Sequence, residues 1–464
     1  MIYHEFLKRK SVESVNSGFD IEHSSLHEKL FDYQKDIVKW ALKRGKAAIF
    51  ANTGLGKTLM QVEWAQKVYE RTQKPILLIV PLAVASQTVR EAHKHLNVTV
   101  YRVRQDNDIQ DGLNITNYEN LHNFTPDKFS GVVLDESSIL KSFTGKIRNQ
   151  IIDDFTDTPY KLACTATPAP NDFMELGNHS EFLNIMSRTE MLAMYFIHDS
   201  GETQKWRLKG HGADKFWEWV STWGVMIQSP ADLGYDASAF DLPPLHINQE
   251  VIPAEMQEGF LIPQIAETLS ERQRARKDSI QERCERASAL ANHTDEQWIL
   301  WCNLNDESKL LAELIPDAVE VKGSDSVEHK EQSMIDFADN KIRVLITKPK
   351  IAGMGLNWQN CNHMAFVGLS DSFEQVFQAI RRCYRFGQDK EVFVHMVTSE
   401  LEGNVVKNIK RKEKDFNKMA SEMAKLTKNI LNPDIANASN EKMAYSGEKQ
   451  IQLPPFLKET VKHG

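Results

Sequence analysis

The chain has 464 residues and a formal net charge of −8, with 41% hydrophobic and 26% charged residues. This length suggests about three domains, and the composition is that of a folded globular protein, which excludes a linker-dominated or collagenous chain. The longest apolar run has 11 residues. A membrane span needs about 18, so an integral membrane protein is excluded. The negative net charge excludes a wholly basic nucleic-acid-coating protein but leaves local basic surfaces open.

The N-terminal segment and the cysteines indicate the compartment. Residues 1–28 are polar and aperiodic, so we interpret them as a leader before the first domain. They contain no apolar signal core, and secretion is therefore not expected. The five cysteines show no metal-knuckle spacing such as C-x-x-C. We expect reduced thiols in a cytoplasmic protein.

The rest of the chain divides by pattern. Over 29–172, short apolar runs alternate with stretches that have apolar residues at helical spacing, which predicts an α/β lobe with a parallel sheet. The stretch 173–290 is rich in Met, Trp, Glu and Arg, and we predict a mostly helical insertion. The alternation returns over 291–400, which predicts a second α/β lobe, and 401–464 is predicted to be a helical brace with a polar tail. The predicted strands of the first lobe are 47–51, 76–80, 98–103, 132–134 and 162–165.

The strongest local motif is the segment 51–58, which reads A-N-T-G-L-G-K-T and follows an apolar strand. Glycines at the third and first positions before Lys57 let backbone amides converge on a phosphate chain, and the start of the following helix adds partial positive charge. Lys57 can reach the terminal phosphates, and the Thr58 hydroxyl can hold Mg²⁺. The usual pattern begins with Gly, where this chain has Ala51, and the alternative is a chance turn with a solvated lysine. The candidate nucleotide-binding residues of this loop are Thr53, Gly54, Leu55, Gly56, Lys57 and Thr58.

Two acids follow another apolar strand, in the sequence V-V-L-D-E-S-S at 132–138. Open parallel sheets bind ligands at the carboxyl ends of their strands, where Asp135 and Glu136 would lie. Asp135 is predicted to hold Mg²⁺, and Glu136 to polarise the attacking water as the general base. The alternative is an ordinary acidic turn after a buried strand, and the phosphate loop earlier in the same lobe argues against it.

Further motifs complete an ordered set. The sequence reads T-N-Y-E at 116–119, T-A-T-P at 165–168, G-M-G-L-N at 353–357 and Q-A-I-R-R-C-Y-R-F-G-Q at 378–388. Together with Tyr33-Gln34, the phosphate loop and the acidic pair, these motifs make the chain resemble superfamily-two helicases, and within them the Swi/Snf-like DNA translocases. The resemblance covers residues 30–390. It implies two RecA-like lobes with ATP and Mg²⁺ bound between them.

The resemblance assigns roles at the nucleotide. Tyr33 and Gln34 would lie at the adenine, with the Gln34 amide reading its edge. Arg385 would be the arginine finger, with Arg382 beside it, because a planar guanidinium suits charge spread over phosphoryl oxygens. Since both arginines belong to the second lobe, catalysis would require the lobes to close. The resemblance further implies that Thr165 and Thr167 couple hydrolysis to lobe movement, and that Gly355 and Gln378 contribute to the nucleotide site.

The same resemblance implies contacts to a DNA backbone. Short hydroxyl, amide and backbone donors suit phosphate contacts that carry no sequence information. For Thr116 and Asn117 the alternative is a simple turn. We expect duplex DNA bound without sequence specificity, protein partners in replication or recombination, and a monomer. The candidate nucleic-acid-binding residues are Pro81, Thr116, Asn117, Thr347, Lys348 and Asn357.

Three features stand outside the motifs. The family often has D-E-A-H or D-E-G-H at the acidic pair, and here Ser137 and Ser138 follow the acids, so one coupling contact is expected to differ. The aromatic segment 216–223 could stack on bases, but core packing is favoured. The basic segment 272–277 could contact phosphates or be a solvated helix face. The stretch 401–430 could brace the lobes or face DNA, and we favour the brace.

The sequence thus predicts an ATP-dependent DNA helicase or translocase that hydrolyses ATP between two lobes. One alternative is an RNA helicase, although the acidic motif is not the D-E-A-D of that group. Another is a nucleotide-binding subunit that does not hydrolyse ATP. Lys57, Glu136 and Arg385 argue against this second alternative, because a nucleotide clamp needs neither a general base nor an arginine finger.

Overall fold

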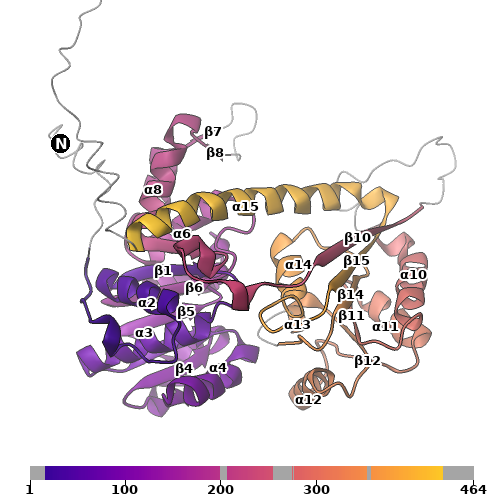
Figure 1. Cartoon of the computed structure of the whole chain (residues 1–464), viewed down its shortest axis with the longest axis horizontal. Helices are drawn as coiled ribbons and strands as arrows, with labels where there is room; N and C mark the ends of the chain where they lie inside the picture. Colours follow the sequence, from indigo (N-terminus) through magenta and orange to yellow (C-terminus); the bar gives the residue numbers. More distant parts are fainter. Residues whose placement is uncertain (1–15, 199–205, 254–273, 275, 353–356, 432–464) are drawn as a thin grey trace, which may run out of the picture.

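The computed structural model describes residues 16–198, 206–253, 274, 276–352 and 357–431. Two parallel β-sheets form two lobes side by side, and the long helix α15 (Gly403–Leu431) runs across both of them (Figure 1). The predicted α/β class with two parallel-sheet lobes is therefore confirmed. No helix among the described residues is long and apolar enough to cross a membrane.

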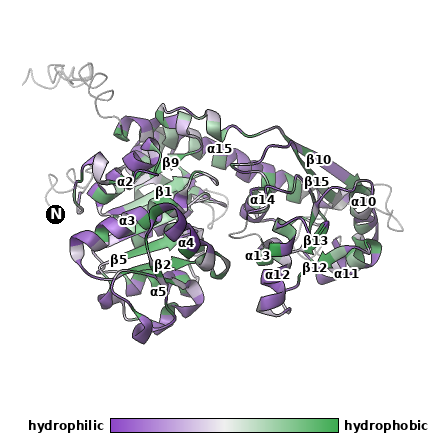
Figure 2. Ribbon diagram, turned by 60° about the horizontal axis from the view of Figure 1, so that its bottom comes forward, coloured by the Kyte–Doolittle hydropathy of each residue, from purple (hydrophilic) through white to green (hydrophobic). Residues whose placement is uncertain are grey.

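The first lobe contains a seven-stranded sheet in the order β3-β4-β2-β5-β6-β1-β9, with every pair parallel. Its central strands are hydrophobic green in Figure 2, as expected for a sheet with helices on both faces. The strands are β1 (Lys46–Ala51), β2 (Ile76–Val80), β3 (Val100–Arg102), β4 (Leu113–Asn117), β5 (Gly131–Asp135), β6 (Tyr160–Thr165) and β9 (Gly224–Ile227). The helices are α2 (Asp32–Arg44), α3 (Lys57–Thr72), α4 (Ala85–Glu91), α5 (Lys146–Asp154), α6 (Leu176–Phe182), α7 (Arg188–Tyr195) and α8 (Ala213–Trp223).

The second lobe contains a six-stranded sheet in the order β10-β15-β14-β11-β13-β12, again with every pair parallel. Its strands are β10 (Leu245–Ile252), β11 (Trp298–Trp301), β12 (Ala318–Glu320), β13 (Val344–Thr347), β14 (His363–Phe366) and β15 (Val392–Ser399). Its helices are α10 (Ile280–Asn292), α11 (Asn305–Leu314), α12 (Val327–Ala338), α13 (Pro349–Ala352) and α14 (Phe373–Ile380).

The stretch 173–290 differs from the predicted helical insertion. It contains helices, but β9 extends the first sheet and β10 extends the second, so this stretch completes both lobes. A short antiparallel pair, β7 (Phe196–His198) and β8 (Trp206–Leu208), also lies within it. The sequence did not reveal β9 because its four residues follow a Trp-rich helix without a break in hydrophobicity.

The structure distinguishes the alternatives left open for the aromatic and the basic segments. Phe216, Trp217, Trp219 and Trp223 are at most 5% exposed, so the aromatic cluster belongs to the core, as favoured from the sequence. In the basic segment, Arg276 is 6% exposed and pairs with Glu402 at 2.8 Å. Arg276 therefore has a structural role, and residues 272, 273 and 275 lie outside the described part of the chain.

Candidate active site

The phosphate loop connects β1 to α3 at the carboxyl edge of the first sheet. Gly54 and Gly56 have φ values of +87° and +75°, a conformation that residues with a Cβ rarely adopt. Gly56 directly precedes α3, so the loop ends at the positive end of the helix dipole. The Lys57 ammonium donates to the backbone carbonyls of Ala51 at 2.9 Å and Asn52 at 3.3 Å. Thus Ala51 fills the first position of the loop and still supplies a backbone oxygen to the lysine.

The other residues of the loop are positioned by neighbours in the same segment. The Thr53 amide donates to the Asn52 side chain at 2.8 Å, and Leu55 is 3% exposed. Thr58 is the second residue of α3 and partly exposed. Its hydroxyl therefore lies in the first helical turn, next to the lysine that precedes it. The structure brings all of the predicted loop residues together.

Tyr33 and Gln34 lie in the first turn of α2 and pack against the phosphate loop. The Gln34 amide donates to the Leu55 carbonyl at 3.0 Å, and the Tyr33 hydroxyl donates to the same oxygen at 3.0 Å. The Gln34 side-chain oxygen accepts from the Phe31 amide at 3.0 Å. Gln34 therefore ties the start of α2 to the loop. Aromatic rings gather here, with Phe240 at 5.4 Å from Phe31 and 5.8 Å from Tyr33.

The acidic pair lies two strands away from the loop. Strand β6 separates β5 from β1, and the register pairs Asp135 with Cys164 and Phe50 with Thr165. The loop, the acids and Thr165 therefore leave the sheet at the same level. Burial and the neighbouring Glu136 raise the pKa of Asp135 to about 6.

The charges of Lys57 and Asp135 affect each other's pKa. Burial lowers the pKa of Lys57, and the charges of Glu136 and Asp135 counteract this. The same lysine opposes the rise in the Asp135 pKa. Gln61, one turn after Thr58 on α3, donates to the Asp135 carboxylate at 2.7 Å. Gln61 was not predicted as a site residue, although its i+3 spacing from Thr58 places both on one helix face.

Glu136 has an unusual backbone. Its φ and ψ are 49° and 51°, the left-handed region, which is costly for a non-Gly residue and is often found at functional sites. Its carboxylate accepts from the Thr165 hydroxyl at 3.3 Å, and the Thr167 amide donates to that hydroxyl at 3.1 Å. The predicted coupling threonines therefore contact the predicted base through a hydrogen-bonded chain.

The Ser137-Ser138 departure has a structural counterpart. Ser137 is buried and hydrogen-bonds to His179 Nε2 of α6 at 3.0 Å. Burial lowers the pKa of His179 to about 4, so the ring is neutral at physiological pH. A histidine from a different helix thus contacts the turn that carries the acids. His179 was not predicted as a site residue, because nothing in its local sequence pattern links it to this turn.

The second lobe brings its arginines to this site. Burial and the neighbouring Arg385 lower the pKa of Arg382 to about 10, and the charges of Glu136 and Asp135 counteract this. The Arg385 guanidinium donates to the Asn357 side chain, and its buried Nε has no partner within the described structure. Arg385 also influences Lys57 electrostatically. The charges of the predicted catalytic residues therefore influence one another across the two lobes.

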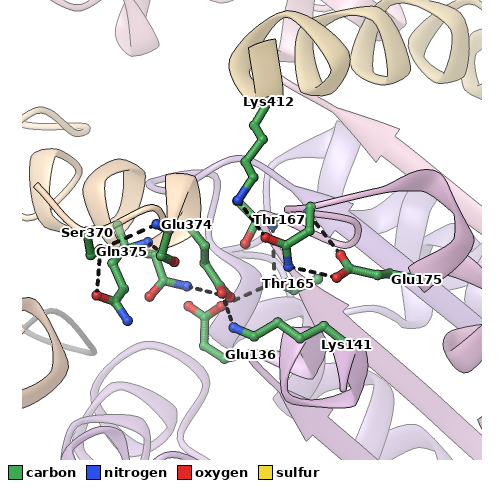
Figure 3. A network of polar contacts seen from close by, with 12 residues as sticks. Glu136, Lys141, Thr165, Thr167, Glu175, Ser370, Glu374, Gln375 and Lys412 are labelled. Carbon is green, nitrogen blue, oxygen red and sulfur yellow. Dashed lines mark hydrogen bonds and ion pairs between the residues drawn. The ribbon is translucent and has the colours of Figure 1, made fainter. Parts of the chain in front are cut away.

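Further contacts join the lobes at this interface. A Cβ at Gly54 would lie 3.1 Å from the backbone nitrogen of Phe386, so the phosphate loop packs closely on the second lobe. Figure 3 shows Lys141, which follows β5, pointing toward Glu374 of α14, and the two form an ion pair. Gln378, a predicted nucleotide contact, donates to the same Glu374 at 3.5 Å.

Helix α15 adds a bridge to this network. Its Lys412, labelled in Figure 3, points from the helix down into the network. It donates to the Asn171 side chain of the first lobe at 2.9 Å and to the Asp371 carbonyl of the second at 2.7 Å. Asn171 in turn donates to Glu175 at 2.8 Å. Lys141, Glu374 and Lys412 were not predicted as site residues, because each acts through a partner in another part of the chain.

The predicted nucleic-acid contacts lie at strand ends of both lobes. Pro81 follows β2, Thr116 and Asn117 end β4, and Thr347 and Lys348 end and follow β13. The side chains of Thr116 and Thr347 are at most 3% exposed, and the Thr347 hydroxyl donates to the Val321 carbonyl at 3.1 Å. Asn117 and Lys348 are partly exposed. Asn357 instead lies with Arg385, and Gly355 falls outside the described residues.

Two parallel-sheet lobes that place a phosphate loop and an acidic pair opposite arginines of the second lobe have the arrangement of a superfamily-two helicase core. Residues 33–191 match the family described as SNF2-related domain, and residues 281–387 match the helicase conserved C-terminal domain. The chain therefore carries both domains of a Swi/Snf-like helicase.

Similarity to individual curated proteins is confined to a short segment. The bifunctional helicase and thymine dioxygenase JBP2 of Leishmania braziliensis is 34% identical over 87 residues, which are 18% of this chain and 8% of that protein. The Leishmania infantum protein of that name gives the same identity and coverage. The matched segment is thus less than a tenth of these curated relatives.

Two solved structures are similar over most of the chain. The SWI2/SNF2 ATPase core of Sulfolobus solfataricus in complex with double-stranded DNA has a TM-score of 0.42 at 17% identity, covering 89% of this chain and 98% of that one. Dbp5 of S. cerevisiae, bound to RNA and ADP BeF3, has a TM-score of 0.49 at 13% identity, covering 82% and 89%.

Proposed function

We propose that this protein is an ATP-dependent DNA translocase that hydrolyses ATP between its lobes, with Mg²⁺ as metal cofactor, and moves along duplex DNA. The observation that carries the proposal is the shared electrostatic environment of Lys57, Asp135 and Glu136 from one lobe and Arg382 and Arg385 from the other. Cations on both sides of an acidic pair suit the charge that a triphosphate and its metal carry during phosphoryl transfer.

The residues present fit this substrate and metal. The raised pKa of the buried Asp135 carboxyl means that its charged form is short of positive partners, which a divalent cation supplies. The Thr58 hydroxyl, on the helix that also brings Gln61 to Asp135, is the second candidate ligand. The unpartnered Nε of Arg385 offers a donor to a phosphoryl oxygen. Asp135 and Thr58 would therefore hold Mg²⁺ beside the phosphates.

In this mechanism ATP with its Mg²⁺ supplies the phosphoanhydride bond that is broken. Glu136 takes a proton from the attacking water, and the Thr165 hydroxyl holds its carboxylate in place. Arg385 and Arg382 stabilise the charge that develops on the transferred group. Because acids and arginines come from different lobes, hydrolysis requires the lobes to be together, and product release allows them to separate.

The DNA part of the proposal rests on side chains at strand ends of the two lobes. Asn117 and Lys348 give both lobes a polar or cationic side chain at a strand end, which suits backbone contacts. If the two lobes contact the DNA backbone in alternation as they open and close, each hydrolysis event moves the protein along the strand. An RNA helicase and a non-hydrolysing subunit are the competing functions.

The deciding experiment measures ATP hydrolysis without nucleic acid and with single-stranded DNA, blunt duplex DNA or duplex RNA. We expect strong stimulation by duplex DNA in the wild type and none in Lys57→Ala. The control is Lys29→Ala, which changes an exposed lysine outside the phosphate loop. Its ATP hydrolysis should match that of the wild type. Stimulation only by RNA would support the RNA helicase instead, and none with any nucleic acid would overturn the motor.

A second variant separates the motor from a nucleotide clamp. Glu136→Gln keeps the size and hydrogen-bonding capacity of the side chain but removes the base. We expect turnover to disappear while binding of a fluorescent ATP analogue stays within a few-fold of wild type. Unchanged turnover would mean that another group acts as the base.

A further inference from the structure

Helix α15 has two opposite faces with different chemistry. Val405, Ile409, Phe416, Met419 and Met423 are buried on one face. The opposite face is exposed and basic, and we call it the basic stripe. It consists of Lys407, Lys410, Arg411, Lys414, Lys418, Lys425 and Lys428, all of them exposed.

The basic stripe is narrow and straight. At about 100° per residue, its seven side chains fall within an arc of roughly 100°, centred opposite the buried face. From Lys407 to Lys428 it runs for about 32 Å, close to one turn of B-DNA at about 34 Å. The described acids of this helix, Glu413, Asp415 and Glu422, lie outside the arc by the same geometry.

Few of these charges are neutralised within the protein. Arg411 pairs with Asp415 at 3.1 Å, and Lys425 approaches Glu422 at 3.9 Å. Of the remaining stripe lysines, none forms an ion pair with any other residue that the structure describes. A row of like charges on one helix face is unfavourable for the helix itself. The arrangement therefore favours an external polyanion as the balancing partner, because attraction depends on the local charge and not on the net charge of the chain.

The buried face explains how the stripe is held rigid. The Phe416 ring lies 5.8 Å from Phe373 and 5.5 Å from Phe377 in the second lobe. In the first lobe, the buried Thr427 hydroxyl accepts from the Met226 amide of β9 at 3.0 Å. The helix is therefore packed against both lobes, and it runs across both of them (Figure 1).

The stripe is separate from the strand-end residues of the DNA proposal. In the first sheet α15 packs at the β9 edge, whereas Asn117 ends β4 near the other edge. In the second sheet Ile409 and Phe416 share a hollow with Leu245 of the edge strand β10, whereas Lys348 follows β13 near the opposite edge. A hollow of about 470 Å³ opens beside the stripe, and its lining includes Lys425, Lys428 and one acid, Asp232.

We propose that the basic stripe of α15 is a second DNA-binding surface, which contacts the phosphate backbone of a duplex along about one helical turn. This inference rests on the proposed function insofar as DNA is taken as the polyanion. Lysines at a regular spacing contact phosphates as point charges without reading sequence, so the surface adds affinity and not specificity.

The first test is the salt dependence of binding to a 40-base-pair duplex. The stripe variant carries Lys407→Gln, Lys410→Gln, Lys414→Gln and Lys418→Gln, and the matched control carries Lys29→Gln, Lys74→Gln, Lys94→Gln and Lys309→Gln, all at exposed positions. We expect the stripe variant to bind at least tenfold more weakly than the control at 100 mM salt. Its slope of log affinity against log salt should be smaller by about three to four. Equal affinities and slopes would overturn the proposal.

The second test detects the contact directly. All five cysteines are buried, so Lys414→Cys introduces a single exposed thiol for a photo-crosslinker. We expect crosslinks to a duplex from this position and none from Lys94→Cys. Absence of crosslinks at position 414 would overturn the proposal even if the glutamine variant binds weakly.

The proposal and the translocase function can fail separately. The stripe variant should keep duplex-stimulated ATP hydrolysis within twofold of the control at saturating DNA, because the nucleotide site is untouched. A loss of maximal hydrolysis or of thermal stability in that variant would show that the lysines act through the brace, and would overturn a separate surface. If the stripe crosslinks to DNA but DNA does not stimulate ATP hydrolysis in the wild type, the DNA-binding surface would stand and the translocase function would be overturned.

Discussion

Lys57 and Lys161 lie at opposite edges of the first sheet, and burial lowers the pKa of both, but the groups around them differ. Burial is the largest cause for both Lys57 and Lys161, and it lowers the pKa of Lys161 to about 7. At Lys57 the charges of Glu136 and Asp135 oppose the shift. At Lys161 the nearby Lys46 adds to the shift, and one acid, Asp157, opposes it.

The partners of the two ammonium groups explain the contrast. Lys161 lies near the amino end of β6. Its ammonium donates hydrogen bonds to three protein oxygens: the carbonyls of Phe182 at 2.9 Å and Thr156 at 3.3 Å, and the Asn184 side chain at 3.1 Å. Lys57 lies at the carboxyl edge, facing acids and the arginines of another lobe. A shifted pKa therefore does not mark a functional site by itself. The convergence of opposite charges from separate elements does.

The largest expected effect comes from removing that convergence. Arg385→Ala should lower kcat for ATP hydrolysis by about 10³-fold while KM changes only a few-fold, because the guanidinium acts mainly on the charge of the transition state. Steady-state kinetics with saturating duplex DNA checks this. Arg274→Ala, at an exposed position, is the control. If kcat fell less than fivefold, the finger would be Arg382 or another cation.

The two lysines themselves provide a matched pair of substitutions. Lys57→Met should lower kcat by about 10²–10³-fold, as expected for loss of a single preorganised charge at the reacting group. Lys161→Met should leave kcat within twofold, since its ammonium contacts only structural oxygens. Lys161 is fully buried and Lys57 is partly buried, so circular dichroism and thermal melts control for folding in both variants. A comparable loss of kcat in both variants would contradict the conclusion that Lys57 acts in catalysis and Lys161 only in the structure.

The phosphate loop around Lys57 could be predicted from the sequence, whereas the contacts between the lobes and two edge strands could not. The phosphate loop and the acidic pair are local motifs, and a strand followed by a glycine turn or by two acids can be recognised without the fold. Glu374 and Lys141 are isolated charges in the sequence and gain meaning only when α14 meets the end of β5. Strands β9 and β10 were missed because the parallel pairing that defines them joins segments more than 100 residues apart.

The ion pair between the lobes should have an intermediate effect. Glu374 is 5% exposed and pairs with Lys141 across the interface, so breaking the pair removes a contact made only when the lobes are together. Lys141→Met and Glu374→Gln should each lower DNA-stimulated kcat about tenfold, and the double variant should lose no more than the larger single effect. A double-mutant cycle on kcat and KM measures this coupling.

Two controls keep that cycle interpretable. Thermal melts of the four proteins show whether Glu374→Gln acts on folding, and basal hydrolysis without DNA shows whether the nucleotide site is intact. Additive losses in the double variant would mean that Lys141 and Glu374 act independently, and the pair would then have no role in holding the lobes together.

The smallest effect concerns stability and comes from Lys161. Its pKa is about 7 in the folded protein and 10.5 in the unfolded chain, so between these values the unfolded state binds more protons. The free energy of unfolding should therefore rise with pH from 7 to 10.5, by at most about 1.4 kcal/mol per pH unit from this group. Lys161→Met leaves three oxygens without their donor, which lowers stability by an amount independent of pH, but it removes this slope.

Urea unfolding of wild type, Lys161→Met and the exposed control Lys29→Met at pH 7.5 and 9.5 measures this. The gap in the free energy of unfolding between Lys161→Met and wild type should widen at the higher pH. A gap that stays constant would mean that Lys161 is charged in the folded protein at both pH values, and the contrast with Lys57 would then rest on the partners alone.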